Sequence, residues 1–557
     1  MNTAMPIGID DFAEARRRYY LVDKTAVISQ LVQHPAQVTL FTRPRRFGKT
    51  MLMSMLRYFL DIEGAEEHRR LFDGLAVSQD AATMQLQGSR PVLFLTLKGW
   101  KANNWQEMQE VIVDGLGQMF DEREYLLDTP TLTKRERRTF EAIQMGTASI
   151  ITCRSALVLL LRLLARHYGK KPVLLLDEYD VPIQTAWTHH YYDEAIGFFR
   201  EFLSGALKSN ENLDFAVLTG VLRIAKESIF SDLNNLKVDS LVHVQYPKAF
   251  GFTSDEVAQM AADLGKTDNL AELRDWYDGY RLKGQEIYNP WSVLNYFDRG
   301  CQPEPYWVNT SGNAILQEML QHASEETLQA MQGVLQGQSI TAMLREGVIY
   351  SEIYANRNAL YTMLLTTGYL TCAQSERTDL GTRAQLIIPN REILALFRRE
   401  VLERYQLDNL PTDVQELLQA LLQGDVATVQ RGLGEYLAVL TSMFDVAMGK
   451  ESFYHGFVLG LTAILVPQYE VQSNRESGYG RYDIAVFPKQ AGKPGLVLEF
   501  KTAETEDELP TKAQEALQQI VARDYTATFR ARDVQMVYHY GIAFCGKKVQ
   551  VAIAREE

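Results

Sequence analysis

The sequence predicts a multidomain α/β protein, with a parallel sheet in its N-terminal half, a helical middle region and a second compact α/β unit at its C-terminal end. Three observations predict this fold class. Short apolar runs alternate with helical stretches over residues 1–250, leucines recur at helical spacing over residues 413–422, and helix and strand patterns mix again after residue 449. Short β-rich runs separated by helices are typical of a parallel sheet that helices cover on both faces.

The chain has 557 residues, which is too long for one hydrophobic core and therefore predicts several domains. We predict an N-terminal α/β domain at 1–250, a small helical appendage at 251–330, a helical linking domain at 331–445 and a C-terminal α/β domain at 446–557.

The composition argues for a cytoplasmic protein that does not enter a membrane. Hydrophobic residues make up 46% of the chain, and no window approaches the roughly 18 uninterrupted apolar residues of a membrane span. The N-terminus lacks the basic start and apolar run of a secretory signal. The net charge of −13 argues against a protein that coats nucleic acid over its whole surface. We expect any contact with nucleic acid to be local or to be supplied by a metal ion.

A candidate phosphate-binding loop, RPRRFGKT at 43–50, follows an apolar strand and precedes a helical run. Strand, loop and helix in this order place backbone N–H groups and a helix N-terminus where they hold phosphate. We expect Lys49 to reach the β- and γ-phosphates, Thr50 to bind Mg²⁺, and Gly48, Arg45 and Arg46 to complete the site. The full P-loop pattern has glycine at position 43, where this chain has arginine. The alternative is a basic turn that caps a helix.

Two later strands end in residues that suit the same ligand. The run VLLLDE at 173–178 predicts a buried strand that brings Asp177 to the Mg²⁺ shell and Glu178 to the attacking water, which it would orient or deprotonate. Thr219, at the end of another apolar run, is expected near the γ-phosphate, although a simple strand-ending turn explains it equally well. Arg223 is a weaker candidate for a phosphate sensor.

The segments TRPRRFGKT, YLVDKT before it, and LLLDEYD, LTGV, WYDGY, YNPWSV and GYLT after it occur in this order along the chain. Together they resemble the bacterial AAA-ATPase-like family that is commonly fused to a PD-(D/E)xK nuclease domain. The resemblance covers essentially the whole chain. It implies a P-loop NTPase fold and ATP as the nucleotide, and in this family arginine at position 43 is usual.

Two acids and a lysine occur on neighbouring apolar runs of the C-terminal unit. Asp483 precedes the run IAVF, and Glu499 and Lys501 alternate along GLVLEFK, so both point to one side of that strand. Burying either charge without compensation is expensive, which favours a bound cation and a phosphate. We expect Asp483 and Glu499 to bind Mg²⁺ or Mn²⁺, and Lys501 to position the nucleophile or stabilise charge on the phosphate. This chemistry is hydrolytic cleavage of nucleic acid.

Two flanking helices add further candidates. Glu451 is expected to complete the metal shell, or else it is an ordinary first-turn acid that the helix dipole favours. Gln519 is expected to touch the substrate or order the active-site water, or else it is an exposed helical glutamine.

The order Glu451, Asp483, Glu499-x-Lys501, Gln519 resembles the PD-(D/E)xK nuclease pattern. NRESGYGRYDI followed by VLEFK is similar to the version that is fused to this ATPase family. The resemblance implies a restriction-endonuclease-like α/β fold for the C-terminal domain. Because every motif position is present, the site is expected to be active, and a degraded, purely structural nuclease fold is the alternative.

These observations lead to the hypothesis of an ATP-controlled, metal-dependent nuclease that acts on nucleic acid, with DNA favoured over RNA. By analogy, the pairing of domains suggests a role in bacterial defence against phage or mobile DNA. The alternatives are an ATP-sensing scaffold or regulator that assembles or recruits partners without cleavage, and an ATPase that remodels nucleic acid. The sequence leaves open whether the chain forms a homo-oligomer and whether ATP is hydrolysed or only sensed.

Overall fold

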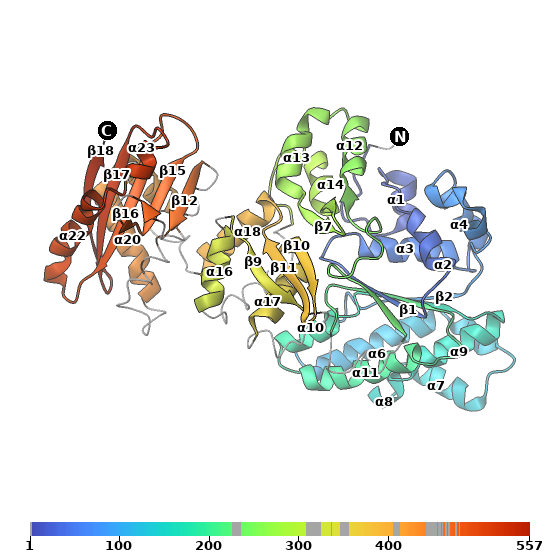
Figure 1. The fold of residues 1–557 in the computed structure, drawn as a ribbon. Coiled ribbons are helices and arrows are strands. Elements are labelled where there is room, and N and C mark those ends of the chain that lie inside the picture. The colour runs from blue at the N-terminus through green and yellow to red at the C-terminus, as the bar shows by residue number, and fades with distance from the viewer. Residues whose placement is uncertain are drawn as a thin grey trace. The chain divides into compact units, whose positions relative to one another are not determined.

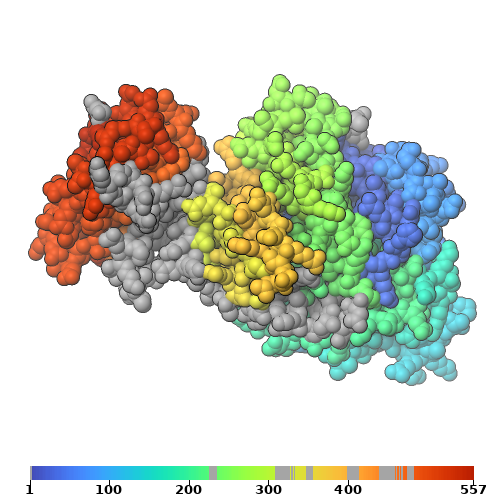
Figure 2. Space-filling model, viewed as in Figure 1, coloured from blue at the N-terminus to red at the C-terminus, as the bar shows by residue number. Residues whose placement is uncertain are grey.

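The structure is a computed structural model. It describes residues 3–224, 235–307, 325–335, 337–345, 356–404, 413–441, 454, 458, 461–462, 465, 468–473, 476–477 and 480–556, which are coloured by residue number in Figure 2. The chain folds into two compact units, of which one comprises Met1–His322 and Ile340–Ile393 and the other comprises Ala323–Ser339 and Leu394–Glu557. The domain boundaries predicted at residues 250, 330 and 445 stay predictions.

A five-stranded sheet organises the N-terminal half of the first unit. Its strands are β1 (Val38–Thr42), β2 (Val92–Thr96), β3 (Val173–Asp177), β4 (Ala216–Gly220) and β5 (Leu236–Asp239). The strand order is β2-β3-β4-β1-β5, and every pairing is parallel. Leu218 of β4 pairs with Leu40 on one side and with Leu176 on the other, so β1, β3 and β4 end at the same edge. The predicted parallel sheet is confirmed.

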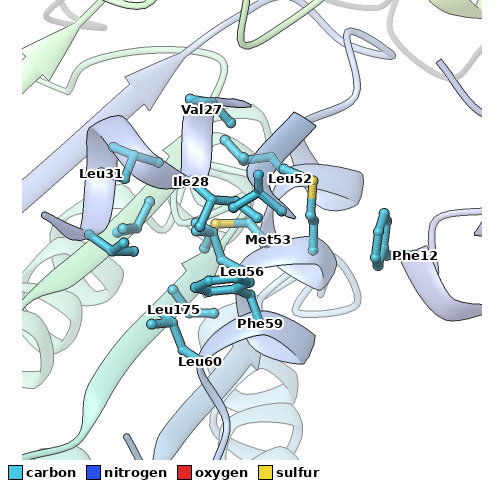
Figure 3. Close-up of a cluster of buried hydrophobic side chains, with 14 of the residues drawn as sticks. Phe12, Val27, Ile28, Leu31, Leu52, Met53, Leu56, Phe59, Leu60 and Leu175 are labelled. Atoms are coloured by element: carbon cyan, nitrogen blue, oxygen red, sulfur yellow. The ribbon is translucent and has the colours of Figure 1, made fainter. Parts of the chain in front are cut away.

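Helices cover both faces of this sheet (Figure 1). They are α1 (Phe12–Arg18), α2 (Ala26–Val32), α3 (Lys49–Leu60), α4 (Ala65–Arg69), α5 (Ala81–Met84), α6 (Trp105–Asp121), α7 (Lys134–Gln144), α8 (Ile150–Cys153), α9 (Ala156–Tyr168), α10 (Val181–Thr188) and α11 (Tyr192–Leu207). On one face Phe12, Ile28 and Phe59 pack with Leu175 of β3 in a continuous apolar core (Figure 3). Full burial of each such side chain contributes about 1.5–3 kcal/mol, so this core fixes α3 against the sheet.

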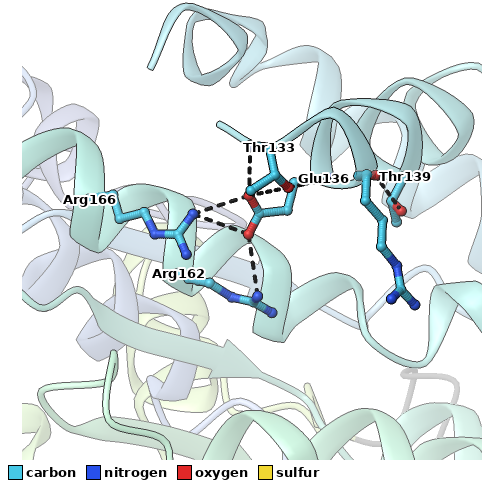
Figure 4. A network of polar contacts seen from close by, with 6 residues as sticks. Thr133, Glu136, Thr139, Arg162 and Arg166 are labelled. Atoms are coloured by element: carbon cyan, nitrogen blue, oxygen red, sulfur yellow. Dashed lines mark hydrogen bonds and ion pairs between the residues drawn. The ribbon is translucent and has the colours of Figure 1, made fainter. Parts of the chain in front are cut away.

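A polar contact joins two helices on the other side of the sheet. Glu136 of α7 accepts hydrogen bonds from Thr133, the N-cap of the same helix, and from Arg162 and Arg166 of α9 (Figure 4). The Arg166 contact measures 3.1 Å and the Arg162 contact 3.3 Å. One carboxylate therefore both caps α7 and ties it to α9.

Two small antiparallel sheets complete the first unit. The first sheet has the strand order β6-β8-β7, and its strands are β6 (Phe252–Thr253), β7 (Tyr280–Leu282) and β8 (Gln285–Tyr288). The helices in the same part of the chain are α12 (Ser254–Asp263), α13 (Leu270–Tyr277) and α14 (Pro290–Asp298). The second sheet has the strand order β10-β11-β9, and its strands are β9 (Ile340–Leu344), β10 (Thr371–Thr378) and β11 (Gly381–Ile387). Helix α17 (Arg357–Thr367) lies between β9 and β10 in the sequence.

These strands differ from the mainly helical pattern predicted for residues 251–445. The strands of the first small sheet have two to four residues, which is too short for an alternating pattern to stand out. Strand β10 is mostly exposed and polar, so it shows little apolar periodicity. The helices around these strands dominate the sequence pattern.

The second unit contains a mixed five-stranded sheet with the order β12-β15-β16-β17-β18. Its strands are β12 (Tyr469–Ser473), β15 (Ile484–Pro488), β16 (Gly495–Thr502), β17 (Val537–Cys545) and β18 (Lys548–Glu556). Two short strands, β13 (Glu476–Ser477) and β14 (Gly480–Arg481), form a separate antiparallel pair. Strands β16 and β17 are parallel, and the other neighbours in the sheet are antiparallel. The predicted second α/β unit is confirmed.

Helices pack on both faces of this second sheet. The helices that share a core with this sheet include α19 (Val414–Gln423), α20 (Val426–Thr441), α22 (Leu509–Ala522) and α23 (Ala527–Arg530). Two further helices, α16 (Glu325–Leu335) and α18 (Arg391–Arg404), precede them in the chain. Ile520 of α22 packs with Val497 on one face, while Leu417 of α19 and Leu433 of α20 share a core with Leu498 on the other. Within the part of the chain that the structure describes, no helix is both long enough and apolar enough to span a membrane.

Candidate nucleotide and metal sites

The loop between β1 and α3 has the backbone shape of an anion-binding turn. Two of its residues have left-handed backbone, Arg46 at φ 64° and Gly48 at φ 84°. Gly48 directly precedes the first turn of α3, where a left-handed conformation favours glycine because it has no Cβ. The loop therefore lies at the N-terminus of α3, whose unpaired N–H groups and positive dipole end attract phosphate.

Arg43, which stands where the full P-loop pattern has glycine, is a structural residue of the sheet. Its side chain is fully buried, forms an ion pair with Asp239 of β5 and donates to the Thr42 carbonyl at 2.9 Å. The same Asp239 carboxylate accepts the N–H groups of Gln245 and Tyr246 at 2.7 and 2.8 Å. Arg43 does not have left-handed backbone, so an arginine here causes no strain in the loop. It ties β1 to β5, and sequence reasoning missed Asp239 because its partner lies almost 200 residues away.

Lys49 is buried beneath this loop. Its side chain is 5% exposed, and its ammonium donates to the carbonyls of Arg43 and Pro44 at 3.0 and 2.8 Å. Burial lowers the pKa of Lys49, while three nearby carboxylates, led by Glu178, oppose this shift. A phosphate oxygen at the mouth of the loop would give the ammonium a charged acceptor in place of the two carbonyls.

Two threonine hydroxyls converge on Asp177 at the end of β3. Thr50 Oγ1 donates to Asp177 Oδ2 at 2.8 Å, and Thr219 Oγ1 donates to Asp177 Oδ1. The three residues come from separate parts of the sequence and meet because parallel strands end at one edge of the sheet. Carboxylate and hydroxyl oxygens are suitable ligands for Mg²⁺, directly or through water. The structure thus brings three predicted site residues together.

Glu178 follows Asp177 with φ 54°, which is uncommon for a residue that carries a side chain. Its backbone N–H donates to Thr219 Oγ1 at 3.3 Å. Burial raises the pKa of Glu178, and the positive charge of Lys49 opposes the shift. A carboxyl group with a raised pKa next to a phosphate site suits a general base.

A cavity of about 780 Å³ opens over the loop, a size within the range of small-molecule sites. Six predicted site residues line it: Arg45, Arg46, Gly48, Lys49, Thr50 and Glu178. The rest of its wall includes the apolar side chains of Tyr20, Met51, Phe252, Trp291 and Leu294. A wall that combines positive charge with apolar surface fits a nucleoside polyphosphate. Asp177 and Thr219 are fully buried, and Arg223 is not among the residues that line the cavity.

The two loop arginines are held in different ways. The Arg46 guanidinium carbon lies 3.7 Å from the centroid of the Trp291 ring, a cation–π contact. Arg45 has a long contact of 3.4 Å to the side-chain oxygen of Gln184. Burial lowers the pKa of Arg46, and the charge of Arg45 adds to this effect. Both cations therefore lie in the cavity wall, where a polyanion would lower their mutual repulsion.

Aromatic residues of the later motifs pack around the loop. The rings of Phe47 and Tyr280 meet edge to face with centroids 5.0 Å apart. Trp307 Nε1 donates to the Arg45 carbonyl at 3.3 Å, and the Tyr280 hydroxyl donates to the Gly368 carbonyl at 3.0 Å. The motifs WYDGY and GYLT thus support the loop, a role that their sequence alone did not disclose.

A buried carboxyl group adjoins this packing. Glu392, in the first turn of α18, is fully buried and accepts hydrogen bonds from the Ser292 hydroxyl at 2.8 and 3.0 Å. It also accepts the Trp307 N–H at 2.8 Å. Burial raises the pKa of Glu392 to about 8. Sequence reasoning missed this residue because a first-turn glutamate is usually solvated.

In the second unit, Asp483, Glu499 and Lys501 lie together at one end of β15 and β16. Asp483 Oδ2 accepts the Phe500 N–H at 2.8 Å, which joins the approach to β15 with β16. Glu499 and Lys501 are two residues apart on β16, and their charged groups are 3.7 Å apart. The Glu499 side chain is 4% exposed, whereas that of Lys501 is 27% exposed. A buried acid thus lies beside a cation that reaches solvent.

Gln519 of α22 reaches the same place. Its Nε2 donates to Glu499 Oε1 and to the Tyr525 hydroxyl, the latter at 3.2 Å. Burial raises the pKa of Tyr525, and the negative charges of Glu499 and Asp483 act in the same direction. Gln519 is therefore not an exposed helical glutamine. Sequence reasoning missed Tyr525, whose only signal is its position shortly after the end of the helix that carries Gln519.

Comparison with family models identifies both parts of the chain. Residues 6–230 match the model of the AAA-ATPase-like family, described as a predicted AAA-ATPase, and residues 449–553 match that of the PD-(D/E)XK nuclease superfamily. The chain contains an AAA-ATPase-like domain and a PD-(D/E)XK nuclease domain. The resemblance noted from the sequence is confirmed. A protein of Azotobacter chroococcum mcd 1, described as an uncharacterized protein in the vnfD 5′ region, is 27% identical over 556 residues, which cover 97% of this chain and 96% of that protein.

The PD-(D/E)XK nuclease domain has carboxylates that fit a divalent cation. Asp483 and Glu499 supply oxygen ligands of the kind that Mg²⁺ and Mn²⁺ prefer, and Lys501 supplies a positive charge beside them. Glu451, the predicted third ligand, lies outside the described residues. Among the residues that are described, no group of three or more histidine, cysteine, aspartate or glutamate side chains is placed to hold a metal. Water and phosphate oxygens are suitable ligands to add to these two carboxylates.

Proposed function

We propose that this protein is an ATP-binding, divalent-metal-dependent nuclease that hydrolyses phosphodiester bonds of nucleic acid. The observation that supports the proposal most strongly is the juxtaposition of Asp483, Glu499 and Lys501 in a domain that matches the PD-(D/E)XK nuclease superfamily. The three groups lie where a cation and a phosphate can be held together.

Each residue of this set has a distinct part. Asp483 and Glu499 offer carboxylate oxygens to a divalent cation, which when bound supplies an activated water and offsets phosphate charge. Lys501, which is partly exposed, stabilises the negative charge that develops on the phosphate oxygens. Gln519 fixes the orientation of Glu499 through its donated hydrogen bond. Together these groups position and polarise one phosphodiester bond.

The AAA-ATPase-like domain is proposed to bind ATP with Mg²⁺ in the cavity over the loop. Lys49, Arg45 and Arg46 would hold the phosphates, while Thr50 and Asp177 would hold the Mg²⁺ shell. Glu178, which lines the same cavity and whose pKa is raised by burial, would act on an attacking water. Thr219, whose hydroxyl donates to Asp177, and Arg223, which follows β4 in the chain, are proposed to recognise the terminal phosphate, although neither lines the cavity.

We propose that nucleotide state controls cleavage, that the substrate is DNA and that the protein acts in the cytoplasm in defence against phage or mobile DNA. The presence of both domains on one chain supports the first point. The net charge of −13 supports a local, metal-assisted contact with the substrate rather than a broad basic surface.

A cleavage assay tests the proposed function. Full-length protein is incubated with duplex DNA, single-stranded DNA and RNA in Mg²⁺ or Mn²⁺, with and without ATP, beside Asp483→Ala. Wild-type protein is expected to cut at least one substrate, and Asp483→Ala is expected to lose at least about 100-fold in rate because a metal ligand is removed.

The matched control is Asp507→Ala, which removes an exposed carboxylate from the short 3-10 turn Glu506–Glu508 of the same domain. This variant should cut like wild type. Absence of cleavage by wild-type protein under every condition would refute the proposal, and ATP-dependent assembly without cleavage would favour the scaffold alternative.

A further inference from the structure

The motif LLLDEYD ends in Tyr179 and Asp180, which have no part in the function proposed above. Both side chains are buried, with Tyr179 at 0% and Asp180 at 1% exposure. They occupy the short turn between β3 and α10, directly after Asp177 and Glu178. A buried hydroxyl and a buried carboxylate both need hydrogen-bond partners, and the partners of these two lie in one segment of the chain.

That segment is the backbone that follows β4. Asp180 Oδ2 accepts the N–H groups of Val221 and Leu222, both at 2.8 Å. The Tyr179 hydroxyl donates to the Leu222 carbonyl at 2.6 Å and accepts the Ile224 N–H at 3.1 Å. Two side chains at the end of β3 therefore hold four polar backbone groups of residues 221–224.

Gly220 permits this close contact. A Cβ at this position would lie 2.6 Å from the Tyr179 ring and 2.7 Å from Asp180 Oδ1, which is closer than real Cβ atoms approach. Gly220 does not have left-handed backbone, so the requirement comes from space rather than from conformation. The glycine of LTGV and the last two residues of LLLDEYD are thus two sides of one contact.

Asp180 also connects this contact with the phosphate loop. It lines the nucleotide cavity, and its negative charge is one of the three that act on Lys49. Its Oδ1 accepts no hydrogen bond from any residue in the described part of the chain. The carboxyl group therefore uses one oxygen to hold residues 221 and 222. Burial raises the pKa of Asp180, while these two N–H groups and the charge of Lys49 oppose the shift.

Arg223 lies between the residues that Tyr179 and Asp180 hold. Its side chain is partly exposed, and Val221, at the start of the same held segment, lines the nucleotide cavity. We propose that Tyr179 and Asp180 are positioning residues that set the place of Arg223 for recognition of the terminal phosphate of a nucleoside triphosphate. This inference rests on the proposed binding of ATP in the cavity.

The test compares triphosphate and diphosphate affinity by isothermal titration calorimetry on the full-length protein with Mg²⁺. The ligands are ADP and an ATP analogue with a β,γ-imido bridge, and the measured quantity is the ratio of their Kd values. Wild type should prefer the triphosphate, and Arg223→Ala should lower this preference about 10-fold because one hydrogen bond to a charged group is lost.

Tyr179→Phe removes only the hydroxyl and should lower the preference in the same direction. In the Tyr179→Phe, Arg223→Ala double variant the ratio should equal that of Arg223→Ala alone, because the hydroxyl acts through Arg223. Tyr540→Phe is the matched control, since it removes a buried hydroxyl that donates to the Leu421 carbonyl at 2.8 Å in the second unit. Its ratio should remain that of wild type.

Should Tyr179→Phe fail to fold, Asp180→Asn and Asp180→Ala serve the same purpose. Asparagine keeps an acceptor oxygen and should retain most of the preference, whereas alanine should lose it. A wild-type ratio in Tyr179→Phe, or effects of the two substitutions that multiply in full, would overturn the inference. Equal affinity of wild type for both ligands would also overturn it, while failure to bind either ligand would refute ATP binding itself.

Discussion

Asp177 and Glu499 are both buried carboxylates on apolar strands, but they are held in different ways. Asp177 has both oxygens bonded to hydroxyls, Thr50 from the start of α3 and Thr219 from β4. Glu499 has Lys501 two residues along its own strand and Gln519 on the helix that packs against that strand. The nucleotide centre therefore needs three segments that are far apart in the sequence, whereas the acidic centre is built from neighbouring segments: Asp483 before β15, the strand β16 and the helix α22.

This difference predicts how each site responds to substitution. The acidic centre depends on few side chains, so single substitutions there should remove chemistry and leave the fold intact. The nucleotide centre depends on buried packing such as the Arg43–Asp239 pair, so some substitutions near it should change stability first. Substitutions of Lys49, Arg43 and Glu392 separate a loss of ligand binding from a change in stability.

Lys49→Ala should give the largest effect on ligand binding, and it should act on nucleotide binding alone. Loss of a charge-assisted hydrogen bond to phosphate is expected to weaken ATP binding by about 10- to 100-fold. Cleavage measured without ATP should stay at the wild-type rate, because the acidic centre is built from other residues. Calorimetric titration with ATP and the cleavage assay check both points. Lys170→Ala, an exposed lysine, is the control, and unchanged ATP affinity in Lys49→Ala would contradict the assignment of the loop.

Arg43→Gly restores the full P-loop pattern and should nevertheless destabilise the protein. It leaves the Asp239 carboxylate buried without its cation, which costs about 3–5 kcal/mol in the free energy of unfolding. Urea unfolding followed by circular dichroism measures the loss.

Arg299→Ala is the comparison for Arg43→Gly, since it breaks an ion pair with Glu304 in which both side chains are about half exposed. That change should cost less than about 1 kcal/mol. Equal stability of Arg43→Gly and wild type would show that the buried pair is dispensable.

Glu392→Gln should have the smallest effect of the three at pH 5, and its main consequence should be a change in the pH dependence of stability. The pKa of folded Glu392 is raised from 4.5 to about 8, so between these values the folded protein holds a proton that the unfolded chain has released. The contribution of Glu392 to the free energy of unfolding is therefore fully present below about pH 4.5 and is lost as pH rises towards 8. Glu392→Gln should remove this slope and be more stable than wild type at pH 9.

Urea unfolding at pH 5, 7 and 9 measures the slope, and Glu376→Gln on the exposed part of β10 is the control. Parallel pH profiles for wild type and Glu392→Gln would contradict the raised pKa.

Sequence patterns predicted the larger elements because these elements repeat a signal over many residues. The apolar runs of β1, β3 and β4, the helix after the loop and the strands around Asp483 and Glu499 all appear where expected. The small sheets were not predicted, since strands of two to four residues, or polar ones such as β10, carry little periodicity.

The candidate sites were predicted less completely, for a different reason. Motif spacing identifies groups that hold ligands, such as Lys49 and Glu499, because their chemistry requires those residue types. It does not identify residues that contact other protein residues rather than a ligand, such as Asp239, Glu392 and Tyr525, because tertiary packing determines their partners. Glu451 lies outside the described residues and stays a prediction.

The most direct test of two phosphate-handling centres is anomalous diffraction from a crystal of the full-length protein soaked with Mn²⁺ and a non-hydrolysable ATP analogue. We predict one Mn²⁺ peak within ligand distance of the Asp483 and Glu499 carboxylates and a second between the analogue's phosphates and Thr50. Soaked crystals with no anomalous density between Asp483 and Glu499 would contradict the proposed nuclease centre.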